Sequence, residues 1–214
     1  MGKGDTRTRR ALAEPACAGS RAFQPSRTMI SAGRAALIAV AALFVLSCSQ
    51  RFEWREVRIG DGAVASLPGR AQSVTRELDV AGQRMSMTMW STGVGPTMFA
   101  VGAARLPAPL ATDPAGRAQV IAYFRDGLVR NIGGTVSASA AAPLSLPPGG
   151  VRRLLASEAV EASGSPARDG RKSRLAARFF IVDDQFFQVV ALGAEGEIPP
   201  EVLETFFTSF RLAP

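Results

Sequence analysis

Alternating apolar and polar residues predict a β-rich domain between residues 54 and 214. Successive side chains of a strand point to opposite faces, so a period of two indicates a half-buried strand. Tight turns at Ala81-Gly82 and Asp183-Asp184 separate two pairs of such segments and predict hairpins. The pattern predicts strands at 54–59, 63–67, 74–80, 83–91, 98–106, 135–141, 151–161, 174–182 and 185–192.

Two further segments follow a helical period. The first starts at a Thr112 or Asp113 cap, with Pro114 suited to the first turn. Its apolar positions, spaced by three or four, are Ile121, Phe124, Leu128 and Ile132. The second opens at Pro199-Pro200 and carries an apolar stripe, Leu203, Phe206, Phe207 and Phe210. The order of elements predicts a single α+β domain over 54–214, an antiparallel sheet covered by two helices.

Adjacent phenylalanines indicate how the helices pack. Phe179-Phe180 and Phe186-Phe187 each place one ring on each face of the sheet. We therefore expect both faces to be covered, one by each helix.

An export signal precedes this domain. Arg34 is followed by an uncharged apolar run, Ala35–Leu46. Its twelve residues are too few for a membrane span, which needs about 20, but fit a signal peptide. Val45-Leu46-Ser47-Cys48 then resembles the lipobox of bacterial lipoproteins. We interpret 29–47 as a lipoprotein signal peptide and 48–53 as a lipid anchor and short tether.

The lipobox resemblance implies diacylglycerol on the Cys48 thiol, cleavage between Ser47 and Cys48, and acylation of the new amine. Two or three acyl chains give durable anchoring, at about 0.8 kcal/mol per buried methylene. The predicted partner is thus a membrane, reached through Cys48. By analogy with Gram-negative sorting, Ser49 favours the outer membrane, facing the periplasm. The alternatives are a plain signal peptide or uncleaved anchor, and a short buried core helix that carries Cys48 by chance.

Residues 1–28 are rich in Arg, Ala, Gly and Pro and show no apolar period. They are either a long positively charged extension of the signal or a mis-assigned extension upstream of a true start at Met29. We favour the second interpretation, because 29–47 is complete as a signal.

Charge and composition narrow the function classes. Of the formal net charge of +7, residues 1–47 carry seven basic and two acidic side chains, which leaves residues 48–214 nearly neutral. Nucleic acid is therefore not an expected partner. The chain has no histidine, and its two cysteines are Cys17 and Cys48. Histidine-dependent relays, imidazole zinc sites and a cysteine nucleophile are excluded from the processed domain, and no cofactor is predicted.

Met85, Met87 and Met89 are the candidate metal ligands. In a strand all three thioethers share one face, and soft thioethers favour Cu(I). Core packing is the simpler interpretation, because methionine fills irregular core space. A copper or silver carrier is kept as an alternative.

Charged residues offer two weaker candidates. A basic group around one loop could meet anionic lipid headgroups: Arg168, Arg171, Lys172, Arg174 and Arg178. Glu158 and Glu161 are separated by an odd number of positions on one strand, so they face opposite ways. No catalytic residues are predicted.

A family resemblance rests on Trp54, the segment Val64-Ala65-Ser66-Leu67-Pro68-Gly69, the hairpin around Gly82, and the ending Phe206-Phe207-Thr208-Ser209-Phe210-Arg211-Leu212. With these features, residues 54–212 resemble small envelope lipoproteins with a PsbP-like fold, a group that includes DcrB-type proteins. The resemblance implies a non-enzymatic accessory role with an envelope protein partner. The remaining alternative is a hydrolase or transferase that works without histidine.

Starting translation at Met29, by deletion of residues 2–28, is expected to leave the abundance and membrane location of the processed protein unchanged. Arg34 and the run that follows supply the signal by themselves. Immunoblotting of cell fractions measures the outcome, and deletion of Ala35–Leu46 is the control that should block export. Loss of export on the first deletion would show that residues 2–28 belong to the signal.

Overall fold

The computed structural model describes residues 52–149, 152–165 and 170–213. These belong to one compact unit, Gln50–Pro214. Residues 1–28, the predicted signal peptide at 29–47 and the predicted lipid site Cys48 lie outside the described residues.

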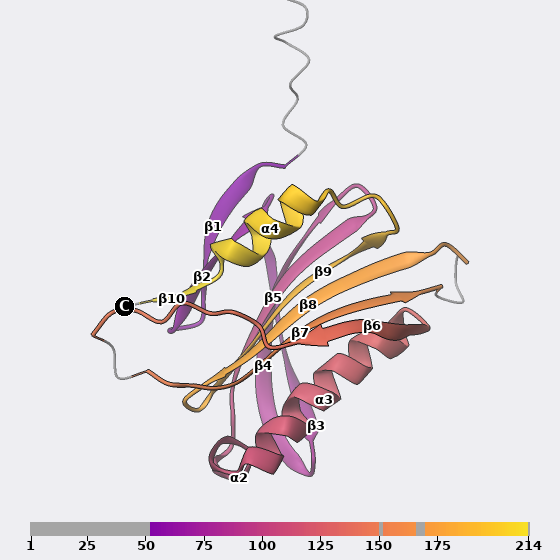
Figure 1. The fold of residues 1–214 in the computed structure, drawn as a ribbon. Coiled ribbons are helices and arrows are strands. Elements are labelled where there is room, and N and C mark those ends of the chain that lie inside the picture. Colours follow the sequence, from indigo (N-terminus) through magenta and orange to yellow (C-terminus); the bar gives the residue numbers. More distant parts are fainter. Residues whose placement is uncertain (1–51, 150–151, 166–169, 214) are drawn as a thin grey trace, which may run out of the picture. The chain divides into compact units, whose positions relative to one another are not determined.

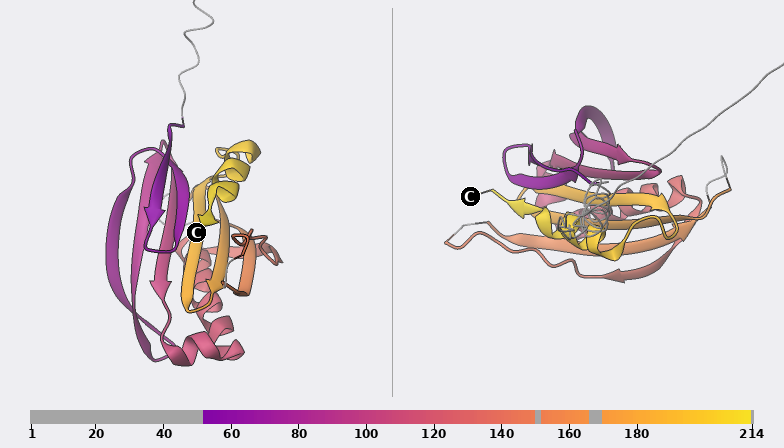
Figure 2. Two further views of the ribbon diagram at one scale, coloured as in Figure 1. Left: turned by 90° about the vertical axis from the view of Figure 1, so that its left-hand side faces the viewer. Right: turned by 90° about the horizontal axis from the view of Figure 1, so that it is seen from above.

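Seven strands form one antiparallel sheet in the order β3-β4-β5-β9-β8-β7-β6 (Figure 1). Each half is a meander of sequence neighbours, and the pairing of β5 with β9 joins the halves. The sheet is strongly twisted (Figure 2). Its strands are β3 (Gln72–Val80), β4 (Gln83–Val94), β5 (Thr97–Arg105), β6 (Gly134–Ala140), β7 (Leu154–Gly164), β8 (Ser173–Val182) and β9 (Gln185–Ala194).

The two predicted hairpin turns are confirmed. Ala81 and Gly82 both have positive φ, 52° and 75°, as a two-residue turn between twisted strands requires. Asp183 has φ 54° between β8 and β9, and aspartate tolerates this conformation better than most residues. These turns fix the registers Val80↔Gln83 and Val182↔Gln185.

A second, smaller sheet was not predicted. Its strands are β1 (Trp54–Ile59), β2 (Ala63–Pro68) and β10 (Arg211–Leu212), in the order β1-β2-β10. β10 has only two residues, which pair with Val64 and Ala63 of β2. A strand of two residues is too short to show an alternation of apolar and polar positions, and its partner β2 lies far away in the sequence. The sequence pattern therefore could not predict it.

Three helices complete the unit: α2 (Ala108–Thr112), α3 (Pro114–Asn131) and α4 (Pro200–Ser209). The Asp113 carboxylate caps α3 by accepting hydrogen bonds from the backbone N–H groups of Ala115 and Gly116, at 3.2 and 3.1 Å. Asp113, rather than Thr112, is therefore the cap. The short α2 was not predicted. Within the described ranges, no helix combines the length and apolarity needed to cross a bilayer.

The adjacent phenylalanines divide the interior into two cores, as predicted. Phe179 and Phe186 face α3, where the Phe124 ring stacks on Phe186 at 4.5 Å. Phe180 and Phe187 face the opposite side, where the Phe210 ring lies 5.3 and 5.5 Å from theirs. On this second side the helix α4 shares the cover with the small sheet, whereas the sequence predicted the helix alone. The α+β class and the antiparallel sheet are confirmed.

Two strands, β4 and β7, differ from the prediction by three residues at a limit, whereas the limits of the other predicted strands agree within two residues. β4 extends to Val94 because it pairs with β5 through Val94↔Thr97. β7 covers Leu154–Gly164 rather than 151–161 because its pairing with β8 begins at Leu154↔Val182 and ends at Gly164↔Ser173. Pairing with the neighbouring strand, rather than local sequence, sets both limits.

Phe206→Ala is expected to lower the free energy of unfolding by about 3–5 kcal/mol. Phe206 is fully buried, and its ring lies 5.1 Å from that of Phe99, so truncation leaves a cavity between α4 and the sheet. Urea denaturation of residues 50–214 measures the change. The matched control, Glu204→Ala at an exposed position of the same helix, should stay within about 0.5 kcal/mol. A loss below about 1 kcal/mol for Phe206→Ala would mean that α4 unfolds independently of the sheet.

Candidate functional site

The three candidate methionines share one face of β4, as predicted. That face is the one toward α3. Met85 and Met87 are each only 3 % exposed, while Met89 is half-buried. Two of the three thioethers are therefore core side chains.

Gly102 of β5 makes room for these methionines. It pairs with Met89 of β4 on one side and with Gln188 of β9 on the other. A Cβ at Gly102 would overlap the side chains of Met87, Met89 and Gln188. The methionines thus fill the space that the glycine leaves, which is a packing arrangement.

The Met89 sulfur also has a polar partner. The Gln188 Nε2 donates a hydrogen bond to Met89 Sδ at 3.0 Å. Met98 of β5 is 41 % exposed and pairs with Gly93, about 13 Å along the strands from the Met89 row, so it does not join the three methionines. The geometry therefore favours packing for Met85, Met87 and Met89, and soft-metal binding by them stays a hypothesis.

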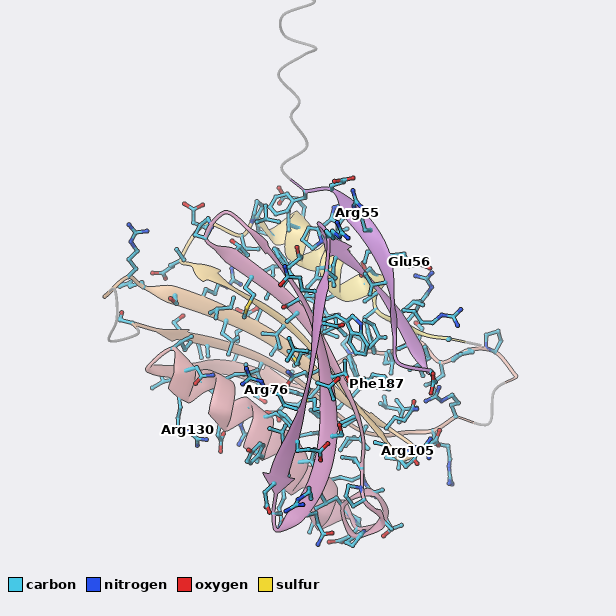
Figure 3. The ribbon with its side chains drawn as sticks, turned by 180° about the vertical axis from the view of Figure 1, so that it is seen from behind. Arg55, Glu56, Arg76, Arg105, Arg130 and Phe187 are labelled. Carbon is cyan, nitrogen blue, oxygen red and sulfur yellow. The ribbon has the colours of Figure 1, made fainter. Side chains whose placement is uncertain are left out.

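Gln188 is an unusual residue for this position. It is 4 % exposed, and its Oε1 has no hydrogen-bond partner among the described residues. A buried acceptor without a partner is uncommon in folded proteins. Gln188 borders a hollow of about 330 Å³, the α3 groove, lined chiefly by Val74, Leu78, Met87, Met89 and Phe124. Arg76 of β3 stands at its edge, between β3 and α3 (Figure 3).

Glu158 and Glu161 point to opposite faces, as predicted. Glu158 accepts hydrogen bonds from Arg125 at 3.2 Å and from the Ser139 hydroxyl at 2.8 Å, which ties α3 to β6 and β7. The pKa of Arg125 is raised above its ordinary value, chiefly by its hydrogen bond to Asp126 and then by Glu158. Glu161 pairs with Arg174 at 3.0 Å on the α4 side. Among the described residues, no group of three or more His, Cys, Asp or Glu side chains could hold a metal ion.

Asp183 and Asp184 lie in the β8–β9 turn, as predicted. Asp183 accepts a hydrogen bond from the backbone N–H of Arg153 at 3.1 Å, and Asp184 pairs with Arg105 at 3.3 Å. Both carboxylates therefore stabilise the turn and the loop beside it.

The predicted basic loop is not one cluster. Lys172 lies 3.9 Å from Glu195, and Arg174 is paired with Glu161. Arg168 lies outside the described residues. Arg178 is not in the loop at all, because it lies midway along β8 on the face toward α4. The grouping of Arg178 with the loop was wrong, since strand alternation carries it onto the sheet.

Arg178 lies in a second hollow, the α4 groove. This groove has a volume of about 420 Å³ and lies between α4 and the strands β6, β7 and β8. Small side chains form its floor and α4 supplies one wall; the lining includes Ala138, Ala140, Ala159, Ala176, Leu203 and Phe207. The Arg178 guanidinium lies 4.4 Å from the centroid of the Phe207 ring.

Burial dominates the electrostatics of Arg178. Its pKa is lowered from the ordinary value by desolvation, and none of the described acidic side chains forms an ion pair with it. Removing water from a guanidinium costs free energy when no anion replaces the lost hydration. The groove is therefore the candidate binding site. Sequence reasoning missed it, although a single charge between Ala177 and Phe179 in an apolar strand was a usable signal.

Comparisons with known proteins give only distant likenesses. No family model and no curated protein matches the chain. The chain is similar in structure to PA94 of Pseudomonas aeruginosa, a protein of unknown function, with 12 % identity over 71 % of this chain and 87 % of that one, at a TM-score of 0.32. It is also similar to LpqN of Mycobacterium tuberculosis, described as involved in cell envelope biogenesis, with 15 % identity over 76 % and 92 % of the two chains, at a TM-score of 0.38.

Gln188→Leu is expected to raise the free energy of unfolding by about 1 kcal/mol. A buried oxygen without a hydrogen-bond partner destabilises the fold by about 1–3 kcal/mol, and the substitution removes this oxygen. The only hydrogen bond lost is the one from Gln188 Nε2 to the Met89 sulfur. Urea denaturation measures the effect, and Gln188→Glu, which buries a charge, is the matched variant expected to destabilise. A clear loss of stability in Gln188→Leu would contradict this account and indicate that the amide oxygen has a partner.

Proposed function

We propose that this chain is a lipid-anchored, non-enzymatic binding module of the bacterial cell envelope. In this proposal Cys48 carries the lipid, and the domain from residue 54 onward is PsbP-like and faces the periplasm from the outer membrane. The domain binds or supports another envelope component.

The observation that carries the proposal is the short distance along the chain between Cys48 and the folded unit. Phe52 is the fourth residue after Cys48, so the link spans at most about 14 Å when fully extended. Phe52 stacks on Trp54 at 6.3 Å and meets the Phe99 ring edge-on at 6.2 Å, which fastens the start of the unit to its core. Lipids on Cys48 would therefore hold the domain directly at a membrane surface.

Two features support binding rather than catalysis. The chain has no histidine, the side chain best suited to proton transfer near neutral pH. Glu158 and Glu161, the carboxylates least explained by the sequence pattern, are both paired with arginines. The domain has two concave surfaces, the α3 groove and the α4 groove, that could bind a ligand or a partner.

Cys48→Ala is expected to abolish incorporation of radiolabelled palmitate and to leave the protein either unprocessed or soluble. The thiol is the attachment point for diacylglycerol in this proposal. Autoradiography and cell fractionation measure the two effects. Cys17→Ala is the matched control and should label and fractionate as the parent chain does. Unchanged labelling and membrane retention of Cys48→Ala would refute the proposal.

A further inference from the structure

The α4 groove has an unusual combination of surfaces. Its floor is made of small apolar side chains, Ala138, Ala140, Ala159 and Ala176, and its wall of Leu203 and Phe207. A volume of about 420 Å³ lies within the range of small-molecule sites, about 300–1,000 Å³. A hollow of this volume with a floor of small apolar side chains can accommodate one flexible chain.

Two charged side chains of this groove, Arg178 and Glu204, form no ion pair with any residue that the structure describes, and of the two only Arg178 is half-buried. Glu161 lines the groove but is paired with Arg174, and Glu204 is exposed at the rim. Arg178 is half-buried against Phe207 and forms no ion pair with any acidic residue that the structure describes. The planar guanidinium suits bidentate hydrogen bonding to a carboxylate or phosphate.

Strand register places Arg178 beside the apolar floor. Arg178 pairs with Ala159 of β7, which pairs in turn with Ala140 of β6. The next row on the same face holds Ala176, Glu161 and Ala138. A ligand with its head on Arg178 can therefore lay an apolar tail along these alanines.

We propose that the α4 groove binds a single-chain anionic amphiphile from the membrane, with the head on Arg178 and the acyl chain on the alanine floor. The source of the ligand rests on the function proposed above, because lipids on Cys48 would hold the groove beside a bilayer. The recognition chemistry does not depend on anchoring.

Calorimetry with residues 50–214 tests the recognition, since both cores lie within this unit. Dodecanoate is expected to bind with one-to-one stoichiometry, and about tenfold more tightly than dodecanol, which has the same chain without the charge. Arg178→Gln should remove this preference. Arg130→Gln, on the exposed face of α3, is the matched control and should preserve it.

A second variant tests the floor independently of the charge. Ala140→Leu changes an exposed residue of β6, so the fold should be retained, and the larger side chain should weaken dodecanoate and dodecanol alike. Circular dichroism of each variant checks the fold. Equal affinity for dodecanoate and dodecanol in the parent unit, tighter binding of dodecyltrimethylammonium, or no effect of Ala140→Leu would each overturn the proposal.

Vesicles test the source. Residues 50–214 are mixed with phosphatidylcholine vesicles that contain oleic acid, and oleate is measured in the supernatant after sedimentation. The parent unit should withdraw oleate into solution and Arg178→Gln should withdraw less. Binding of dodecanoate in solution without withdrawal from vesicles would overturn the membrane source. The outcome for Cys48→Ala bears on the anchor alone, so failure of the anchor and failure of the groove are distinguishable.

Discussion

The whole unit depends on burying both faces of one sheet. Because adjacent residues of a strand face opposite ways, the pairs Phe179-Phe180 and Phe186-Phe187 expose large rings on either side unless each side is covered. α3 supplies the cover on one side, and α4 with the small sheet supplies it on the other. The long connections in the chain exist to bring these covers into place: α2 and α3 lie between β5 and β6, and α4 returns the C-terminus to β2.

α4 by itself is too short to cover its face of the sheet. Seven strands at about 4.8 Å spacing span roughly 29 Å across, whereas the ten residues of α4 extend only about 15 Å. The part of this sheet face that α4 leaves uncovered is lined by side chains that can contact water or a ligand. Beside α4, alanines line this part of the face together with Glu161, Arg174, Arg178 and Glu204. The α4 groove therefore follows from this mismatch between helix length and sheet width.

This architecture explains which features the sequence could predict. The α+β class, the two hairpins and the two-sided phenylalanine packing follow from short-range alternation and turn chemistry, and all are present. β10 and the exact limits of β7 depend on partners far along the chain, so local patterns do not contain them. The same applies to Arg178. Ala176 and Phe180, two positions away on either side, place it on an apolar face of the strand, but only the position of α4 brings Phe207 over it. The shared face of Met85, Met87 and Met89 was predictable, whereas the partner of Met89 on β9 was not.

The free edges of the sheet have a further consequence. β3 carries Arg76, Glu77 and Asp79 at exposed positions, and the pairing of β6 with β7 shifts register between Val136 and Ala138. Charges and irregular pairing make an outer strand a poor template for another chain. Lipid-tethered molecules share a thin layer above a bilayer, where their local concentration far exceeds that in free solution. In the lipid-anchored arrangement proposed above, edges of this kind would oppose strand-to-strand aggregation between neighbouring copies.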